Sequence, residues 1–262
     1  MLDPEWAITR ALLWLALVAM VGLLVLRAVR RDRREYQRFK RYRSTKRRQA
    51  MYRKWLRDSF LSFGAAAVVL AVLAGAFIAP LLAATSAWPP VAAVRDWVAA
   101  NPVLAVVVGL VAVAAFAALT VIGVTAARQE GEVPTIGDIH AMLPRNRPEL
   151  GLGALLSVNA GIVEELVFRL GLPALLFGAT GSALAAVFGS VLLFGALHAY
   201  QGVAGVVGTT LIGAVFMAAY LLSGSILVPI ALHALFDVRS MVVIPMAVNG
   251  AHRVPAVSPP RS

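Results

Sequence analysis

Long runs of apolar residues without a charged side chain are the feature that most constrains this chain. Such runs cover residues 11–26, 59–87 and 101–127. A helix needs about 20 mostly apolar residues to cross the hydrocarbon core of a bilayer. The chain is also 60% hydrophobic and only 14% charged, whereas soluble domains are roughly 45–50% apolar and about 25% charged. The sequence therefore predicts an all-α, polytopic transmembrane helical bundle.

The distribution of charge predicts how the bundle is oriented. Residues 27–57 hold 15 of the 24 Lys and Arg and two acids, a net charge of +13, so the remaining residues carry −2. Asp3 and Glu5 precede the first apolar run, which is the reverse of a secretory signal peptide. By the positive-inside rule, residues 27–57 are a cytoplasmic insert and the N-terminus is extracytoplasmic.

The remaining spans follow a proline-containing loop at 127–150. We expect helices near 150–170, 181–200, 204–222 and 225–249, with a break of the last near Arg239 or Pro245. The segment 171–181 is either a re-entrant piece or a continuation of the preceding helix. The prediction is seven or eight spans in two regions: an N-terminal membrane region at 1–149 with three spans, and a second region at 150–250. A Pro/Ser/Arg tail at 251–262 is expected to be disordered.

The basic insert also contains aromatic residues at spacings of three and four, which indicates helical faces. Each Lys or Arg near an anionic leaflet contributes about 1 kcal/mol of attraction. We expect a helical segment that contacts anionic lipid headgroups. A plain topology signal is the alternative. Nucleic-acid binding is not expected, because basic and aromatic residues together are equally typical of membrane surfaces.

The second region carries ionisable residues inside its apolar helices. An Asp or Arg at the centre of a membrane helix costs about 2.5–3.5 kcal/mol, and such residues usually mark a function. Structural hydrogen bonds between helices and a transport pathway are the alternatives. The ionisable residues in question are Glu164, Glu165, Arg169, His198, His233 and Asp237.

Spacing divides these residues by role. Glu165 and Arg169 stand four residues apart and can pair on one helix face, which leaves Glu164 as the freer carboxylate. Phe194 with His198, and His233 with Asp237, have the same spacing. If Glu164 and the two histidines converge, the group suits general-base catalysis. Two imidazoles and a carboxylate are also a plausible zinc set, and the residues alone leave both readings open.

Three motifs in this region resemble those of a known family. Residues 164–169 read Glu-Glu-Leu-Val-Phe-Arg, residues 194–198 read Phe-Gly-Ala-Leu-His, and residues 233–237 read His-Ala-Leu-Phe-Asp. In this order they resemble the EExxxR, FxxxH and His-xxx-Asn/Asp motifs of the CPBP intramembrane proteases, also called the Abi or type II CAAX prenyl endopeptidase family. The resemblance covers roughly residues 150–240.

The resemblance implies an active-site cavity within the bilayer, open to the cytoplasm, and hydrolysis of a peptide bond in a membrane-associated substrate. It implies Glu164 as the base, His198 as a ligand of the water or of a metal, and His233 with Asp237 near the oxyanion or a metal. Glu165, Arg169 and Phe194 are structural in this reading. Asp237 departs from the Asn of the eukaryotic prenyl-protein branch, because an ionised Asp cannot donate a hydrogen bond. The broad bacterial branch, and hence a bacterial inner membrane, is favoured.

Other functions remain as alternatives. The sequence contains no HExxH motif, so the zinc-binding helix of zincin proteases is missing. The sequence around Ser223 does not fit a rhomboid GxSG motif. The first alternative is a non-proteolytic membrane scaffold or bacteriocin-immunity-type protein that uses the same fold. The second is a transporter.

Overall fold

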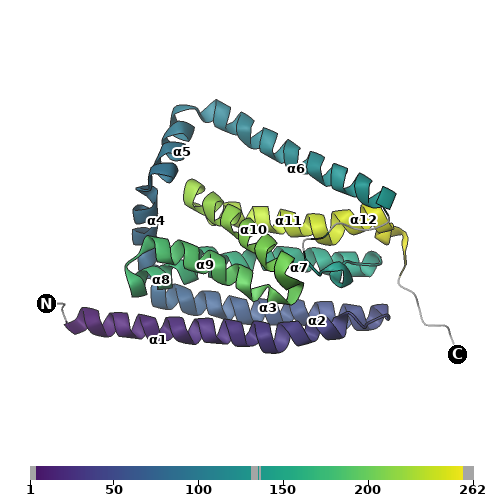
Figure 1. Cartoon of the computed structure of the whole chain (residues 1–262), viewed down its shortest axis with the longest axis horizontal. Coiled ribbons are helices and arrows are strands. Elements are labelled where there is room, and N and C mark those ends of the chain that lie inside the picture. The colour runs from purple at the N-terminus through teal and green to yellow at the C-terminus, as the bar shows by residue number, and fades with distance from the viewer. Residues whose placement is uncertain (1–3, 131–134, 136, 256–262) are drawn as a thin grey trace.

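The computed structural model describes residues 4–130, 135 and 137–255, and every regular element in these residues is a helix (Figure 1). Six of the described helices are long and apolar enough to cross a membrane, and a seventh apolar helix, α9 (Ala183–Leu197), is shorter with 15 residues. The all-α polytopic bundle is therefore confirmed, with a number of spans close to the one predicted. The six long helices are Ala7–Phe39, Thr45–Ser86, Pro102–Gln129, Arg147–Thr180, Ala199–Ser223 and Leu227–Asn249.

The basic insert is built from the ends of two membrane helices. The first helix comprises α1 (Pro4–Arg27), the π-helical η1 (Ala28–Asp32) and α2 (Arg33–Phe39). After a short turn the chain returns in α3 (Thr45–Ala74), a 3-10 turn and α4 (Ile78–Ser86). Residues 27–57 thus form the tip of a long helical hairpin, which we call the basic hairpin. In Figure 1 this hairpin lies along one edge of the bundle.

The aromatic side chains of the basic hairpin pack inside the protein. Phe39 and Tyr52 are fully buried and form a small core with Met51 and Met241. The ring centroids of Phe39 and Tyr52 are 5.3 Å apart in an edge-to-face contact. These residues tie the hairpin to the second region of the chain, while most of the basic side chains around them are exposed.

A buried ion pair makes the same connection. Arg48 is completely buried, and its Nε lies 3.0 Å from a carboxylate oxygen of Glu149. Its guanidinium also donates to the carbonyl oxygens of Ala141 and Leu143. These partners offset the cost of removing the charge from water. Glu149 follows Asn146, whose side chain caps α7 by accepting a hydrogen bond from the backbone N–H of Glu149.

The connection expected between the second and third spans is itself helical. Residues 89–100 form α5 (Pro89–Ala100), which begins with prolines in its first turn, a position where the missing N–H costs nothing. The following helix, α6 (Pro102–Glu130), packs mainly against α5 at one end and α12 at the other. Most of its described side chains are exposed, as expected for a helix that faces lipid. Figure 1 shows α6 slanting away from the rest of the bundle.

The second region supplies the centre of the bundle. α7 (Arg147–Glu165), the π-helical η4 (Leu166–Gly171) and α8 (Leu172–Thr180) form one continuous helix, so the segment 171–181 is a continuation and not a re-entrant piece. α7 packs against both α3 and α11 (Leu227–Val238). Gly161 permits the approach to α11, because a Cβ there would lie 2.9 Å from the backbone nitrogen of Ala234.

The last helices complete the bundle with two features that differ from expectation. α10 (Gly202–Ser223) precedes α11, and the chain continues through the π-helical η6 (Arg239–Val243) into α12 (Ile244–Asn249). The break expected at Arg239 is therefore a π-helical turn in a continuous helix. Of the tail expected to be disordered, Ala251–Arg253 instead form a 3-10 turn with Ala251 fully buried. Residues 256–262 lie outside the described part of the chain.

Candidate active site

A cavity of about 300 Å³ lies where the basic hairpin meets the second region. The segment before α7 and the helices α3, α7, α9, α10 and α11 all contribute to its wall. Four residues singled out by their spacing and motifs line this one cavity. They are Glu164, His198, His233 and Asp237. The three motifs thus converge from three different helices.

Glu165 binds two partners from opposite sides. Its Oε1 accepts a hydrogen bond from Nδ1 of His233 over 2.7 Å. Its Oε2 lies 3.0 Å from Nε of Arg169, which is the i,i+4 pairing predicted from the sequence. Glu165 and Arg169 are almost completely buried, so each charge depends on the other in a setting without water. The Arg169 guanidinium also lies 4.4 Å from the ring centre of Phe194.

His233 is held in a defined orientation by this arrangement. Because Nδ1 donates to Glu165, the other ring nitrogen, Nε2, is directed elsewhere, and it lies 3.6 Å from Oδ2 of Asp237. Phe216 stacks on the imidazole with ring centres 5.2 Å apart. A hydrogen bond at one nitrogen sets which nitrogen of an imidazole is free for chemistry. His233 therefore presents Nε2 and Asp237 together to the cavity.

His198 is positioned by the end of its own helix. α9 ends at Leu197, and Nδ1 of His198 lies 2.8 Å from the carbonyl oxygen of Phe194. A carbonyl oxygen only accepts hydrogen bonds, so Nδ1 carries a proton, and in a neutral ring Nε2 is then the acceptor. The ring of Phe194 lies beneath the imidazole at 4.8 Å between centres. The Phe-xxx-His spacing thus supplies both the hydrogen-bond acceptor and the support for the ring.

Glu164 differs from its neighbour Glu165. It is half-buried and lines the cavity. Within the described residues its carboxylate has neither a hydrogen bond nor an ion pair, whereas Glu165 is occupied by Arg169 and His233. Of the two adjacent carboxylates, only Glu164 is left to act on a molecule in the cavity.

The residues of the cavity include the donor types that the sequence left open for a zinc ion. Within residues 4–130, 135 and 137–255, no three side chains of His, Asp or Glu are placed so that they hold a metal ion together. Nδ1 of His233 donates to Glu165, which leaves Nε2 as the ring nitrogen that faces the cavity. The reaction considered below is written with protein groups alone.

Several residues of the cavity wall were not foreseen from the sequence. Arg27, Asp32, Tyr36 and Trp55 of the basic hairpin line the cavity, although that segment was expected only to contact lipid. The available signal was the presence of two acids, Asp32 and Glu35, among so many basic residues. Tyr200 lies between the basic hairpin and the second region. Its ring centre is 5.6 Å from that of Tyr36 in the hairpin and 5.9 Å from that of His198.

Comparison with protein families agrees with this geometry. The family model for type II CAAX prenyl endopeptidase Rce1-like proteins matches residues 146–239. This segment of the chain is therefore similar to the CAAX protease family. The match begins at the Asn146 cap and contains all three motifs, so the CAAX protease segment coincides with the helices that carry the site. Curated proteins and solved structures gave no significant match.

The fold and the matched segment together give the general character of the protein. It is a multi-pass membrane protein, and its residues 146–239 resemble type II CAAX prenyl endopeptidase Rce1-like proteins. The basic hairpin lies outside the matched CAAX protease segment and yet forms part of the cavity wall. The cavity is therefore a product of both regions of the chain.

Proposed function

We propose that this protein hydrolyses a peptide bond of a membrane-associated substrate with a water molecule activated by Glu164. The observation that carries the proposal is the placement of Glu164, His198, His233 and Asp237 around one cavity, with only the Glu164 carboxylate unpartnered. A carboxylate in a partly desolvated cavity is a suitable general base.

The proposed reaction follows from the free atoms of these residues. Glu164 accepts a proton from water, and the resulting hydroxide attacks the carbonyl carbon of the scissile bond. Nε2 of His198 accepts a hydrogen bond from the same water and orients it. The proton held on Glu164 then passes to the departing amine, so the base returns to its starting state.

His233 and Asp237 are proposed to act on the carbonyl side. Negative charge develops on the carbonyl oxygen as the tetrahedral intermediate forms, and a preorganised donor stabilises it. A protonated His233 is such a donor through Nε2, because Nδ1 is occupied by Glu165. Asp237 lies 3.6 Å from Nε2, so its carboxylate faces the same ring nitrogen. An Asp at position 237 can serve in this way through His233, whereas an Asn there would itself donate a hydrogen bond to the oxyanion.

We further propose a bacterial inner membrane as the location, with the N-terminus outside and the basic hairpin in the cytoplasm. The charge of the hairpin supports this orientation. Because Arg27, Asp32 and Tyr36 line the cavity, the cavity then opens toward the cytoplasmic side. Exposed basic residues of the hairpin, such as Arg34, Arg38 and Lys46, are placed to contact anionic headgroups.

Comparison of membrane proteomes tests the proposal. Cells that express wild type are compared with cells that express Glu164→Ala, and new peptide termini are mapped in the membrane fraction. We expect termini that require Glu164, and cleavage of the same peptides by purified wild type. Asp96→Ala is the matched control, because Asp96 is an exposed carboxylate outside the cavity and its removal should change nothing.

A result of the opposite kind identifies the scaffold alternative. If wild type and Glu164→Ala produce the same termini and support the same cellular phenotype, the proteolytic proposal is wrong. Flux of a solute in proteoliposomes that depends on Glu164 would instead identify a transporter.

A further inference from the structure

Tyr200 lies at the corner between the helix that positions His198 and the helix that follows it. It belongs to the 3-10 turn η5 (Ala199–Gln201), which joins α9 to α10. Its side chain lines the cavity, and its ring centre is 5.9 Å from that of His198. The Tyr200 hydroxyl is close enough to Glu164 and Asp237 to interact electrostatically with both carboxylates. The proposed reaction gives this residue no role.

The hydroxyl group of Tyr200 has an unused hydrogen-bond donor. Its oxygen accepts a hydrogen bond from Nε2 of Gln201 over 3.0 Å. Its own proton has no acceptor among the described residues. Hydrogen bonds in a chain polarise one another, so a hydroxyl that accepts one bond becomes a stronger donor in the next. Tyr200 therefore presents a free O–H group in the cavity wall.

The turn that carries Tyr200 is fixed by contacts with the segment before α7. The backbone N–H of Asp138 donates to the carbonyl oxygen of Gln201 over 2.8 Å. Gly137, with φ +76°, packs against the start of α10, where a Cβ would lie 2.7 Å from the backbone. The Tyr200 ring also meets that of Tyr36 edge to face at 5.6 Å. A donor held in this way is oriented before a substrate enters, which is the condition for strong electrostatic stabilisation.

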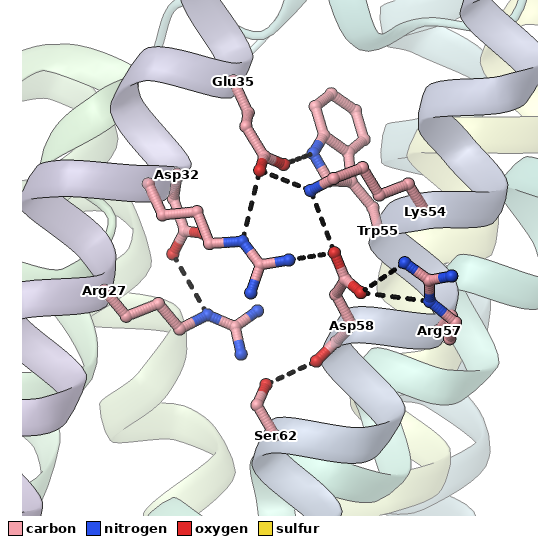
Figure 2. Close-up of polar contacts among 9 residues, drawn as sticks. Arg27, Asp32, Glu35, Lys54, Trp55, Arg57, Asp58 and Ser62 are labelled. Carbon is pink, nitrogen blue, oxygen red and sulfur yellow. Dashed lines mark hydrogen bonds and ion pairs between the residues drawn. The ribbon is translucent and has the colours of Figure 1, made fainter.

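Many other donors of the cavity wall are already bound to protein acceptors. Trp55 donates to Glu35 over 2.9 Å, as Figure 2 shows. Nδ1 of His198 donates to a carbonyl oxygen of its own helix, and Nε of Arg239 donates to Thr120 over 2.7 Å. Further lining residues donate their hydroxyl to a backbone carbonyl oxygen: Tyr36, Thr135, Ser157, Thr209 and Ser240. These donors are therefore engaged before a substrate enters.

Arg27 and Ser59 also keep unused donors, but they lie elsewhere in the wall. Arg27 stands at the end of α1, where it faces Asp32 (Figure 2). Ser59 lies on α3. Both belong to helices of the N-terminal region, whereas Tyr200 directly follows the helix end that carries His198. Tyr200 is therefore the free donor that adjoins the proposed catalytic groups.

The carbonyl side of the proposed reaction needs such a donor. Nε2 of a protonated His233 is one donor to the oxyanion, because Nδ1 is bound to Glu165. Asp237 faces the same nitrogen at 3.6 Å, and an ionised carboxylate accepts hydrogen bonds but cannot donate one. Oxyanion sites combine preorganised donors from the backbone and from side chains such as Asn, Tyr and His. A second donor must here come from another residue of the cavity wall.

We propose that Tyr200 is a further catalytic residue, whose hydroxyl donates a hydrogen bond to the oxyanion of the tetrahedral intermediate. The inference rests on the proposed peptidase function and adds a group to its site. The hydrogen bond strengthens as negative charge develops on the oxygen and weakens when the carbonyl re-forms. Tyr200 keeps its proton throughout. Gln201 is then a positioning residue, because it acts through the hydroxyl of Tyr200.

Removal of one oxygen atom tests the inference. Tyr200→Phe keeps the ring that contacts Tyr36 and His198 and removes only the donor. The full-length proteins are purified in a neutral detergent and assayed with a fluorogenic peptide that spans a Glu164-dependent cleavage position mapped in the membrane proteome. We expect kcat to fall about a hundredfold or more, as on loss of an oxyanion donor, with KM almost unchanged. Tyr220→Phe is the control, because Tyr220 lies on α10 but does not line the cavity; it should keep the wild-type kcat.

A binding measurement tests the same contact without turnover. The Glu164→Gln protein, in which residue 164 does not repel an anion, is titrated with two short peptides of leucine residues. In one, a phosphinate replaces the scissile amide and carries a tetrahedral, negatively charged group. In the other, an uncharged ketomethylene group replaces it. We expect the phosphinate to bind about tenfold or more tighter. Adding Tyr200→Phe should remove most of this preference, and adding Tyr220→Phe should leave it intact.

The contrary results separate failure of the inference from failure of the peptidase proposal. An unchanged kcat in Tyr200→Phe, or a phosphinate preference that is absent from Glu164→Gln or persists after Tyr200→Phe is added, overturns the inference. A lower kcat that comes with a clear fall in the unfolding temperature also overturns it, because Tyr200 is then structural. In each of these cases Glu164-dependent cleavage remains. The peptidase proposal fails, and the inference with it, when no peptide terminus in the membrane fraction depends on Glu164.

Discussion

Nδ1 of His233 donates a hydrogen bond to Oε1 of Glu165 across 2.7 Å, which joins the third motif to the first through two residues 68 positions apart. Oε2 of the same carboxylate faces Nε of Arg169 at 3.0 Å. Glu165 therefore does more than balance the charge of Arg169. It also determines which nitrogen of His233 faces the cavity, and this links the structural residues of the site to the proposed chemistry.

Replacement of Glu165 by Gln should lower activity without removing a catalytic group. An amide can accept from His233 only weakly, and its NH2 opposes Arg169, so the imidazole loses its fixed orientation. Loss of a hydrogen bond to a charged group predicts a decrease in kcat of about ten- to a hundredfold. The rate of peptide cleavage under saturating substrate measures this. An unchanged kcat would show that the contact does not orient His233.

Replacement of Arg169 by Ala should destabilise the protein. Glu165 would remain buried with its main charge partner removed, and breaking a buried pair costs about 3–5 kcal/mol. The temperature of unfolding in detergent should fall well below that of wild type. Arg57→Ala, which removes an arginine that is 69% exposed, should leave that temperature almost unchanged. Equal heat stability of Arg169→Ala and wild type would contradict the pairing.

Gly161 sets the distance between the helices that carry Glu164 and His233. A Cβ at Gly161 would lie 2.9–3.1 Å from the backbone and Cβ of Ala234, so Gly161→Ala must push α11 away from α7. Overpacking of this kind costs typically about 1–3 kcal/mol. We expect a loss of transition-state stabilisation of similar size, which is measured as a decrease in kcat/KM. Gly151→Ala is the matched control on the same helix, because nothing lies within 4 Å of its Cβ position. Equal kcat/KM for both variants would count against this role.

The ion pair between Arg48 and Glu149 should respond differently to single and double replacement. Arg48→Met leaves Glu149 fully buried without its cation, which predicts a loss of about 3–5 kcal/mol. Arg48→Met with Glu149→Leu removes both charges and should recover most of that loss. Thermal unfolding of the three proteins in one detergent compares them. If the double variant is no more stable than the single one, the hairpin is held by other contacts.

The sequence by itself determined the membrane helices and the local pairs within each of them. Apolar length decides whether a helix spans a bilayer, and a spacing of four residues decides which side chains share a face, so the pair of Glu165 with Arg169 was predictable. The same logic separated Glu164 from Glu165. Both properties belong to one segment of chain and need no knowledge of its neighbours.

Only the tertiary structure decided which side chains of different helices face one another. Local spacing paired His233 with Asp237, but the hydrogen bond to Glu165 depends on how α11 packs against α7, where Gly161 allows a close approach to Ala234. The position of Arg27 in the cavity wall is of the same kind. From its sequence a basic insert is interpreted as a surface segment, because the pattern of charges indicates on which side of the membrane it lies. That pattern does not indicate how aromatic residues such as Phe39 pack beneath it.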